Sequence, residues 1–247
     1  MSDISNLNDL LRVTVDVSRR WGISAWWRGH ADCDWTLTPG AFRLGRTRIA
    51  ERNMAIRFMM KARTRRVGCP DENDLGGWFS LMQHYRLPTR LLDWSEMPLA
   101  ALFFAVTELP ERDGCLWVLN PYQLNKPLLG SPTLQGPHGP QARKLLKAAV
   151  ETTYASEGQV LALTPWENDL RMLLQASTFT VHDGPGELEK LPNSKGALER
   201  YRIPAESKAG IAQHLGILGV RRSTLFPDLE NLAADLASFE YADPTGA

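Results

Sequence analysis

A dense polar stretch, residues 83–94, runs directly into an apolar segment, and this pairing limits what the chain can fold into. The stretch reads Gln-His-Tyr-Arg-Leu-Pro-Thr-Arg-Leu-Leu-Asp-Trp, and residues 97–106 after it are almost all apolar. An isolated buried charge is costly to desolvate, so the arginines and Asp93 must be paired or hydrogen-bonded. We therefore expect a buried helix over 97–106 with a polar site beside it.

The composition favours one globular domain with a sizeable core. The chain has 247 residues, of which 43% are hydrophobic, and its 28 basic residues balance 28 acidic ones. This balance gives no general argument for a nucleic-acid or membrane partner. Residues 1–242 are predicted to form the domain, with a frayed tail over 243–247.

The cysteines and the start of the chain favour a reducing, cytoplasmic setting. Cys33, Cys69 and Cys115 are far apart and odd in number, and they form no CxxC pair. We expect no signal peptide and no membrane partner, since no apolar run approaches the ~18 residues that a membrane helix needs. His30 and Cys33 lack a second ligand pair at zinc spacing, so no metal is expected.

The pattern of apolar residues predicts an α+β fold. Helices are expected over 5–20, 47–66, 78–85, 97–106, 141–155, 168–175 and 206–215, and from Pro227 onward, with Ser5 and Ser95 as caps of the first and fourth. Strands are expected over 23–28, 115–119, 159–163, 177–182 and 201–203. Residues 120–140 are expected to form one long loop. We predict a single domain with a mixed or mostly antiparallel central sheet flanked by helices.

Residues 43–66 hold the strongest charge asymmetry of the chain. Nine of them are basic and one, Glu51, is acidic. A solvated helix face, balanced by the acidic residues just beyond it, is one interpretation. A patch that attracts phosphate, including nucleic acid, is the other, although no aromatic interleaving or basic repeat supports a specific nucleic-acid module.

Arg28 and Gly29 form the first group of candidate site residues. Arg28 ends a predicted strand, and arginine offers a planar five-donor fork that suits phosphate or carboxylate. Gly29 allows the backbone to approach a ligand closely. A salt bridge from Arg28 to a partner such as Asp93 is the structural alternative, and such a bridge would also preorganise the arginine.

The second group lies in the polar stretch itself. His84 can transfer protons near neutral pH, and Tyr85 can stack on a base or on nicotinamide. Asp93 is expected either to orient Arg28, Arg90 or a helix start, or to take part in catalysis.

The third group follows the helix predicted over 168–175. That helix would deliver Arg171 and Gln175, and strand alternation places Thr180 and His182 on one side of the next strand. All three groups are therefore candidates for a single pocket.

Motifs spread over most of the chain carry a resemblance to a known family. They are Trp27-Arg28-Gly29, Trp35-x-Leu37-x-Pro39-x-x-x-Arg43, all of residues 83–94, Ala101 with Phe103-Phe104-Ala105, Gln175 with Phe179-Thr180, and Leu225-Phe226-Pro227-Asp228-Leu229. Together they resemble the FRG domain, which is named for a Phe/Tyr-Arg-Gly motif. The chain departs from the family pattern at Trp27, where Phe or Tyr is usual, and at Arg86, where glycine is usual. The second departure is expected to alter access or to add a phosphate contact.

The resemblance implies a bacterial or phage-associated protein in a toxin or defence setting, without a defined reaction. More distantly, the motif order is similar to the NAD-binding layout of Arg-Ser-Glu-type ADP-ribosyltransferases. On that likeness Arg28 would hold the NAD phosphates, and His84 or Tyr85 would contact ribose or nicotinamide. A Glu-x-Glu motif matching that layout is not found.

The leading functional prediction is an enzyme that acts on a nucleotide, either by ADP-ribosyl transfer from NAD or by NAD hydrolysis. The predicted catalytic residues are His84, Tyr85 and Asp93, and the predicted ligand-binding residues are Arg28, Gly29, Gln83, Thr89, Arg90, Arg171, Gln175, Thr180 and His182. The alternative is a non-enzymatic sensor or adaptor for a phosphorylated ligand, nucleic acid bound through residues 43–66, or a phage or antitoxin protein. A nuclease ranks third, because no acidic cluster suited to metal is present.

Overall fold

The framework of the protein is one antiparallel sheet. The computed structural model describes residues 3–45, 47–151, 155–166 and 169–240. The sheet is 6-stranded in the order β4-β5-β2-β1-β3-β6, and all neighbours are antiparallel. The strands are β1 (Trp26–His30), β2 (Leu91–Ser95), β3 (Gly114–Leu119), β4 (Val160–Leu163), β5 (Ser177–His182) and β6 (Leu198–Ile203). This arrangement confirms the predicted α+β fold with an antiparallel central sheet.

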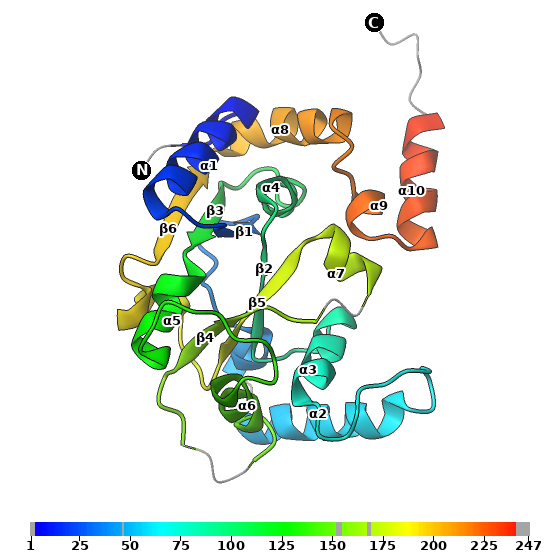
Figure 1. Ribbon diagram of the computed structural model, residues 1–247. Coiled ribbons are helices and arrows are strands. Elements are labelled where there is room, and N and C mark those ends of the chain that lie inside the picture. Colours follow the sequence, from blue (N-terminus) through cyan, green and yellow to red (C-terminus); the bar gives the residue numbers. More distant parts are fainter. Residues whose placement is uncertain (1–2, 46, 152–154, 167–168, 241–247) are drawn as a thin grey trace, which may run out of the picture.

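Helices surround the sheet, as Figure 1 shows. They are α1 (Leu7–Trp21), α2 (Arg48–Ala62), α3 (Leu75–His84), α4 (Pro98–Val106), α5 (Pro121–Leu129), α6 (Pro140–Lys147), α7 (Leu170–Leu174), α8 (Ala205–Ile217), α9 (Arg222–Leu225) and α10 (Leu229–Glu240). Short 3₁₀ turns are η1 (Gly40–Gly45), η2 (Leu188–Lys190) and η3 (Pro192–Ser194). Helices α1, α3, α4, α6 and α8 pack on one face of the sheet, and α5 with η2 packs on the other.

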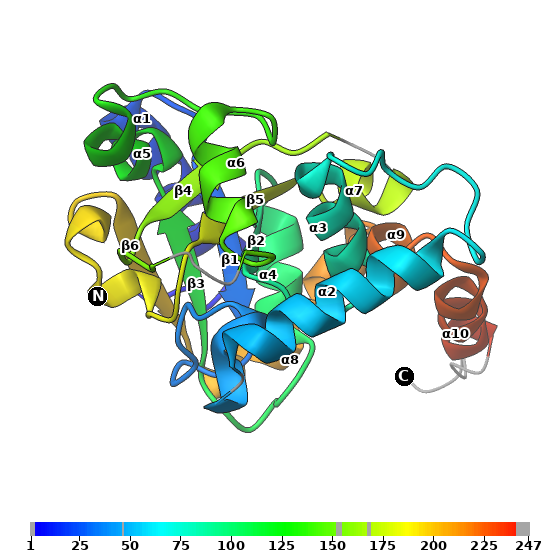
Figure 2. The ribbon, with the colours of Figure 1, turned by 90° about the horizontal axis from the view of Figure 1, so that it is seen from below.

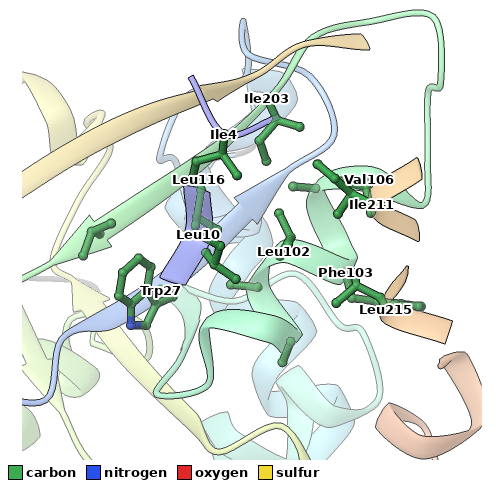
Figure 3. Close-up of a cluster of buried hydrophobic side chains, with 14 of the residues drawn as sticks. Ile4, Leu10, Trp27, Leu102, Phe103, Val106, Leu116, Ile203, Ile211 and Leu215 are labelled. Carbon is green, nitrogen blue, oxygen red and sulfur yellow. The ribbon is translucent and has the colours of Figure 1, made fainter. Parts of the chain in front are cut away.

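The predicted buried helix is confirmed as α4, which lies against the strands that form the middle of the sheet. Its Leu102, Phe103 and Val106 are buried in one cluster with side chains of the sheet, α1 and α8 (Figure 3). Gly29 permits this close approach, because a Cβ there would lie 1.9 Å from the carbonyl oxygen of Ala101. Helix α4 is thereby fixed directly against the strand that carries Arg28.

A second core lies at the other end of the sheet, around α3. Trp78 of α3 is buried with Ala55 of α2, Leu145 of α6 and Val181 of β5. Figure 2 shows α2 crossing this side of the molecule. The polar stretch begins at the end of α3 and continues into β2, where Leu91 joins this core while Leu92 and Trp94 join a third cluster on the opposite face of the sheet.

The prediction of one loop over 120–140 is wrong, because α5 forms within it. Asn120 caps this helix by accepting the N–H of Gln123 at 3.0 Å, and Pro121 stands in the first turn, where its missing N–H costs nothing. Gly130, with φ of 71°, ends the helix. The many prolines of the segment concealed an ordinary pair of helix start and stop signals.

Two of the predicted helix caps are also wrong. Asn6 caps α1 in place of Ser5, and its side chain accepts two N–H groups of the first turn. Ser95 ends β2 instead of starting α4, and its hydroxyl donates to the carbonyl oxygen of Gln175 at 2.6 Å. Met97 is the residue before α4 and provides no side-chain cap.

Three predictions reach residues that the structure does not describe. Asn168 as a helix start, residues 152–154 of the helix expected over 141–155, and the tail over 243–247 all lie outside the described residues. Helix α6 itself ends at Lys147, so that predicted helix is shorter than expected.

Candidate functional site

The sheet opens between its two central strands, β1 and β2. These strands pair at Trp27↔Ser95, whereas β1 pairs with β3 at every residue of β1. The Arg28 side chain enters the gap, and its Nη1 donates to the backbone carbonyl oxygen of Asp93 at 2.6 Å. In a continuous antiparallel pair, a backbone N–H of β1 would bond to the Asp93 carbonyl oxygen. Here the Arg28 side chain takes the place of that N–H and gives the carbonyl its hydrogen-bond partner.

His30 orients Arg28 from within the same strand. Arg28 Nε donates to His30 Nε2 at 3.0 Å, and His30 Nδ1 lies 3.2 Å from the carbonyl oxygen of Trp35. Burial and the adjacent Arg28 guanidinium lower the pKa of His30 to about 3. The imidazole is therefore neutral, with its proton on Nδ1 and its Nε2 free to accept from Arg28.

Asp93 is the exposed residue of β2 and is held by an amide side chain. Gln83 Nε2 donates to Asp93 Oδ2 at 2.8 Å, and the Thr89 hydroxyl donates to Gln83 Oε1. Thr89 Oγ1 also accepts the N–H of Leu91 at 3.0 Å. Three residues of the polar stretch thus fix one carboxylate and leave its Oδ1 available.

Helices α7 and α9 form the opposite wall. The Arg171 guanidinium lies 4.5 Å from the centre of the Phe226 ring, and its Nη1 donates to the carbonyl oxygen of His84 at 3.3 Å. Gln175 Nε2 donates to the carbonyl oxygen of Leu225 at 2.8 Å. The segment after α8 therefore anchors the side chains of Arg171 in α7 and of Gln175, the residue that follows α7.

Two connected cavities occupy the cleft between these walls. The arginine cavity measures about 570 Å³ and is lined by Arg28, Gly40, Arg43, Gln83, Arg86, Leu87, Pro88, Thr89, Leu91, Leu92, Asp93 and Arg171. The aromatic cavity measures about 250 Å³ and is lined by Trp27, Arg28, Gly29, Trp35, Asp93, Trp94, Ser95, Ala101, Phe104, Glu108, Arg171, Gln175 and Ser177. Arg28, Asp93 and Arg171 line both, so they stand at the junction.

Like charges crowd the arginine cavity. Burial and the nearby Arg43 lower the pKa of Arg28 to about 10, against the opposing effect of Asp93. Burial and Arg86 lower the pKa of Arg171, again against Asp93. The four arginines and one carboxylate leave an excess of positive charge, which an anionic ligand would relieve.

His84 lines a third and much smaller space, of about 30 Å³, that also reaches Asp93 and Arg171. Its Nδ1 lies 2.9 Å from Asp169 Oδ2, at ion-pair distance though without hydrogen-bond geometry. Burial lowers the pKa of His84, and Asp169 opposes that shift. Tyr85 packs edge-on against the His84 ring at 4.8 Å, is 56% exposed and lines none of the three spaces.

Arg90 does not belong to this site. Its side chain is completely buried and makes a bidentate ion pair with Glu51 of α2, at 2.9 and 2.6 Å. Its remaining Nη1 donates to the carbonyl oxygens of Leu145, His182 and Asp183. All the bonds shown are internal, so Arg90 ties α2, α6 and β5 together.

Thr180 and His182 also lie away from the cleft, on the opposite face of the sheet from Asp93. Thr180 Oγ1 accepts from Trp94 Nε1 at 3.2 Å and lies 3.1 Å from His182 Nε2. Burial and the nearby Arg90 lower the pKa of His182 to about 3. The alternation of β5 was predicted correctly, but the side carrying these residues faces the core.

The basic helix α2 uses several of its arginines within the protein. Arg48 and Arg52 donate to backbone carbonyl oxygens of residues 148–151 that follow α6. Arg63 lies over the Trp78 ring at 5.5 Å. These contacts account for part of the charge asymmetry without any nucleic acid.

The structure also assigns internal contacts to a Glu-x-Glu sequence at residues 187–189. Glu189 accepts the N–H of Leu37, and Glu187 makes an ion pair with Lys190. Neither glutamate lines the arginine or the aromatic cavity.

Sequence reasoning missed His30, Phe226 and Phe104. His30 was detectable, because in a strand it shares a face with Arg28 two residues earlier. Phe226 packs against Arg171 from a segment distant in sequence, and no local pattern signals that contact. The described residues contain no group of His, Cys, Asp or Glu suited to metal and no helix able to cross a membrane.

The fold and cleft thus define an antiparallel α+β domain with an arginine-lined split in its sheet. Residues 24–114 match the family model of the FRG domain, in agreement with the resemblance seen in the sequence. The match includes Arg28, the polar stretch and α4, while α7, β5 and Phe226 lie beyond it. No curated protein and no solved structure matches the chain.

Proposed function

We propose that the cleft binds NAD and cleaves its nicotinamide–ribose bond, so that the protein is an NAD-consuming enzyme. One observation carries the proposal: Asp93, an exposed carboxylate that lines both cavities, stands where the arginine-lined cavity meets the aromatic-lined one. A dinucleotide has the matching order of parts, with a diphosphate, a ribose and a planar ring.

The arginine cavity suits the diphosphate. Arg28 lies beside Arg43, and Arg86 lies beside Arg171, so each phosphate can contact a pair of guanidinium groups. Arginine binds phosphate oxygens through paired, charge-assisted hydrogen bonds. Its volume of about 570 Å³ lies within the ~300–1,000 Å³ range of small-molecule sites.

The aromatic cavity suits the nicotinamide ring. Trp35 and Phe104 supply apolar walls, while Gln175 and Ser177 supply polar groups for a carboxamide. Burying a flat ring against aromatic side chains is favourable, and a few polar groups then set its orientation. Asp93 lies between this cavity and the phosphate end.

Asp93 gives the cleft its chemistry. Loss of nicotinamide leaves positive charge on the ribose carbon, and a nearby carboxylate stabilises charge of that kind, as in glycosidases. Gln83 holds Oδ2, which keeps the carboxylate fixed at the junction of the two cavities. Fixed charge of this kind requires no reorganisation during the reaction.

The experiment is to incubate the protein with NAD and to measure nicotinamide by chromatography. We expect nicotinamide release by wild-type protein, and a KM raised ~10-fold or more in Arg171→Gln, because a charge-assisted phosphate contact is lost. Arg19→Gln, on the exposed surface of α1, removes the same charge outside the cleft and serves as the control. NAD that stays intact with folded wild-type protein would reject the proposal.

A non-enzymatic sensor of a phosphorylated ligand is the second candidate, and the crowded arginines favour it independently of Asp93. It predicts tight binding of ADP-ribose without turnover of NAD. As part of the enzymatic proposal, we propose a role as a toxin or in defence, because consumption of NAD would harm a host cell. The free thiols of Cys33, Cys69 and Cys115 support a reducing, cytoplasmic location within it.

A further inference from the structure

We infer that the acceptor in this reaction is water, which makes the protein an NAD hydrolase and not a transferase. The inference rests on the proposed NAD cleavage and concerns the space between His84 and Asp93. That space, here called the chamber, is lined by Ser80, Gln83, His84, Asp93, Arg171, Met172, Gln175, Ser177 and Phe179. It meets the aromatic cavity at Asp93, Arg171, Gln175 and Ser177.

The size of the chamber limits what can occupy it. Its volume is about 30 Å³, compared with about 250 Å³ for the aromatic cavity, and an ordered water needs a polar site of only about 10–15 Å³. The chamber therefore accommodates water, and it is small for an arginine, lysine or nucleotide acceptor. Its lining is polar enough to hold water, because Gln83, Ser177 and Gln175 offer hydrogen-bonding groups.

A neighbouring cavity approaches the chamber from the side of α3 and α7. A cavity of about 170 Å³, lined by Arg66, Gly68, Pro70, Asp74, Gly77, Ser80, Leu81, Asp169 and Met172, shares Ser80 and Met172 with the chamber. Ser80 and Met172 are both buried, so the connection is narrow. Water can enter there while NAD fills the cleft on the other side.

His84 is placed to accept the proton of that water. Its Nδ1 is buried beside Asp169 Oδ2, which favours the tautomer with the proton on Nδ1. Nε2, on the other side of the ring, is then the accepting nitrogen. Asp169 also caps α7 by accepting the N–H of Met172 at 2.9 Å, so its carboxylate is fixed by the helix that carries Arg171.

The step balances without any further reactant. The water oxygen forms a bond to the ribose carbon, the bond from that carbon to the nicotinamide nitrogen breaks, and its electron pair stays with nicotinamide. One proton of the water passes to His84 Nε2 and then to solvent. Asp93 stabilises the positive charge on the ribose carbon, and His84 is the general base.

The decisive experiment gives the wild-type enzyme a choice of acceptors. NAD is supplied in H₂¹⁸O with methanol, which is small, or with agmatine, which carries a guanidinium group and is bulky, and the products are identified by mass spectrometry. We expect ¹⁸O-labelled ADP-ribose, some methyl ADP-ribose and no agmatine adduct. An agmatine adduct or an ADP-ribosylated chain would overturn the water inference alone, whereas bound but intact NAD would overturn the cleavage as well.

A variant pair tests the roles of His84 and Asp169. His84→Gln should lower kcat ~10²-fold or more with KM unchanged, because a general base is lost while binding is kept. Asp169→Asn retains a helix cap but lowers the pKa of His84 further, so the acidic fall of the rate should move to lower pH. Unchanged kcat in the first variant, or an unmoved pH profile in the second, would contradict the assignment.

Discussion

Arg86 shows at the scale of one residue how the site departs from its family pattern. Its φ is 60°, in the left-handed region that favours glycine, and glycine is the residue that the FRG resemblance leads us to expect there. Strain of this kind persists where the side chain has a use. Arg86 lines the arginine cavity beside Arg171, so the proposed binding of phosphate would supply that use.

Arg86→Gly should therefore separate stability from binding. We expect the free energy of unfolding to rise by about 1 kcal/mol, because the strain is relieved. Affinity for ADP-ribose should fall, most clearly at low salt. Denaturant titration measures the free energy of unfolding, and calorimetry measures the affinity. Arg57→Gly, at an exposed position of α2, is the matched control, and its free energy of unfolding should fall by about 1 kcal/mol. Equal affinity in wild-type and Arg86→Gly proteins would remove Arg86 from the site.

Buried histidines give a second prediction at this scale. The pKa values of His30 and His182 are lowered to about 3, whereas histidines in the unfolded chain titrate near 6.5. Between these values the unfolded state binds more protons, so stability must fall as the pH drops below about 6.5, by ~1.4 kcal/mol per pH unit for each histidine.

Urea unfolding at several pH values checks this. In His182→Asn, the free energy of unfolding should depend on pH less steeply, by ~1.4 kcal/mol per pH unit. His214→Asn, at an exposed position, is the control. A slope that is the same in wild-type protein and His182→Asn would show that His182 is not held neutral.

At the scale of secondary-structure elements, Gly29 and α4 set the geometry of the cleft. Gly29 lines the aromatic cavity. The position has to be glycine because a Cβ there would clash with the backbone of α4. Gly29→Ala should cost about 3 kcal/mol, because the clash is with helix backbone that cannot easily move. Gly210→Ala, with open space around its Cβ in α8, should gain up to about 1 kcal/mol in the same melting experiment.

Arg90 and Glu51 form the other contact between elements that can be tested. Arg90→Met should destabilise the fold by ~3–5 kcal/mol, since it leaves Glu51 buried without its partner. A double variant with Met at both positions should recover most of that loss, because no charge is then left buried. If Arg90→Met instead keeps its stability and loses ligand affinity, the sequence-based placement of Arg90 in the site is correct.

The sequence predicted most elements and part of the site, and the failures have identifiable causes. Period-two and helical patterns located β5 and α4, because each is set by its own residues. Which face of β5 meets the cleft depends on its pairing with β2, so Thr180 and His182 were misplaced. Arg90 lies outside the cleft, and the sequence could not predict this, because its partner Glu51 is 39 positions away and no local pattern links them.

At the scale of the whole molecule, the cleft joins parts of the chain that are far apart in sequence. Arg28 comes from β1, Asp93 from β2, Arg171 from α7, and Phe226 follows α9 (Figure 1). The FRG match ends at residue 114, before α7 and Phe226. The proposed activity therefore depends on the fold beyond the matched segment.

The central claim is that Asp93 acts in catalysis while the arginines bind the ligand, and Asp93→Asn tests it most directly. NAD binding by calorimetry and nicotinamide release are measured on the same preparation. We expect a Kd close to that of wild-type protein, because Asn can still accept from Gln83, and a kcat reduced ~10²-fold or more, because charge stabilisation is lost. An Asp93→Asn protein that releases nicotinamide at the wild-type rate would contradict the account.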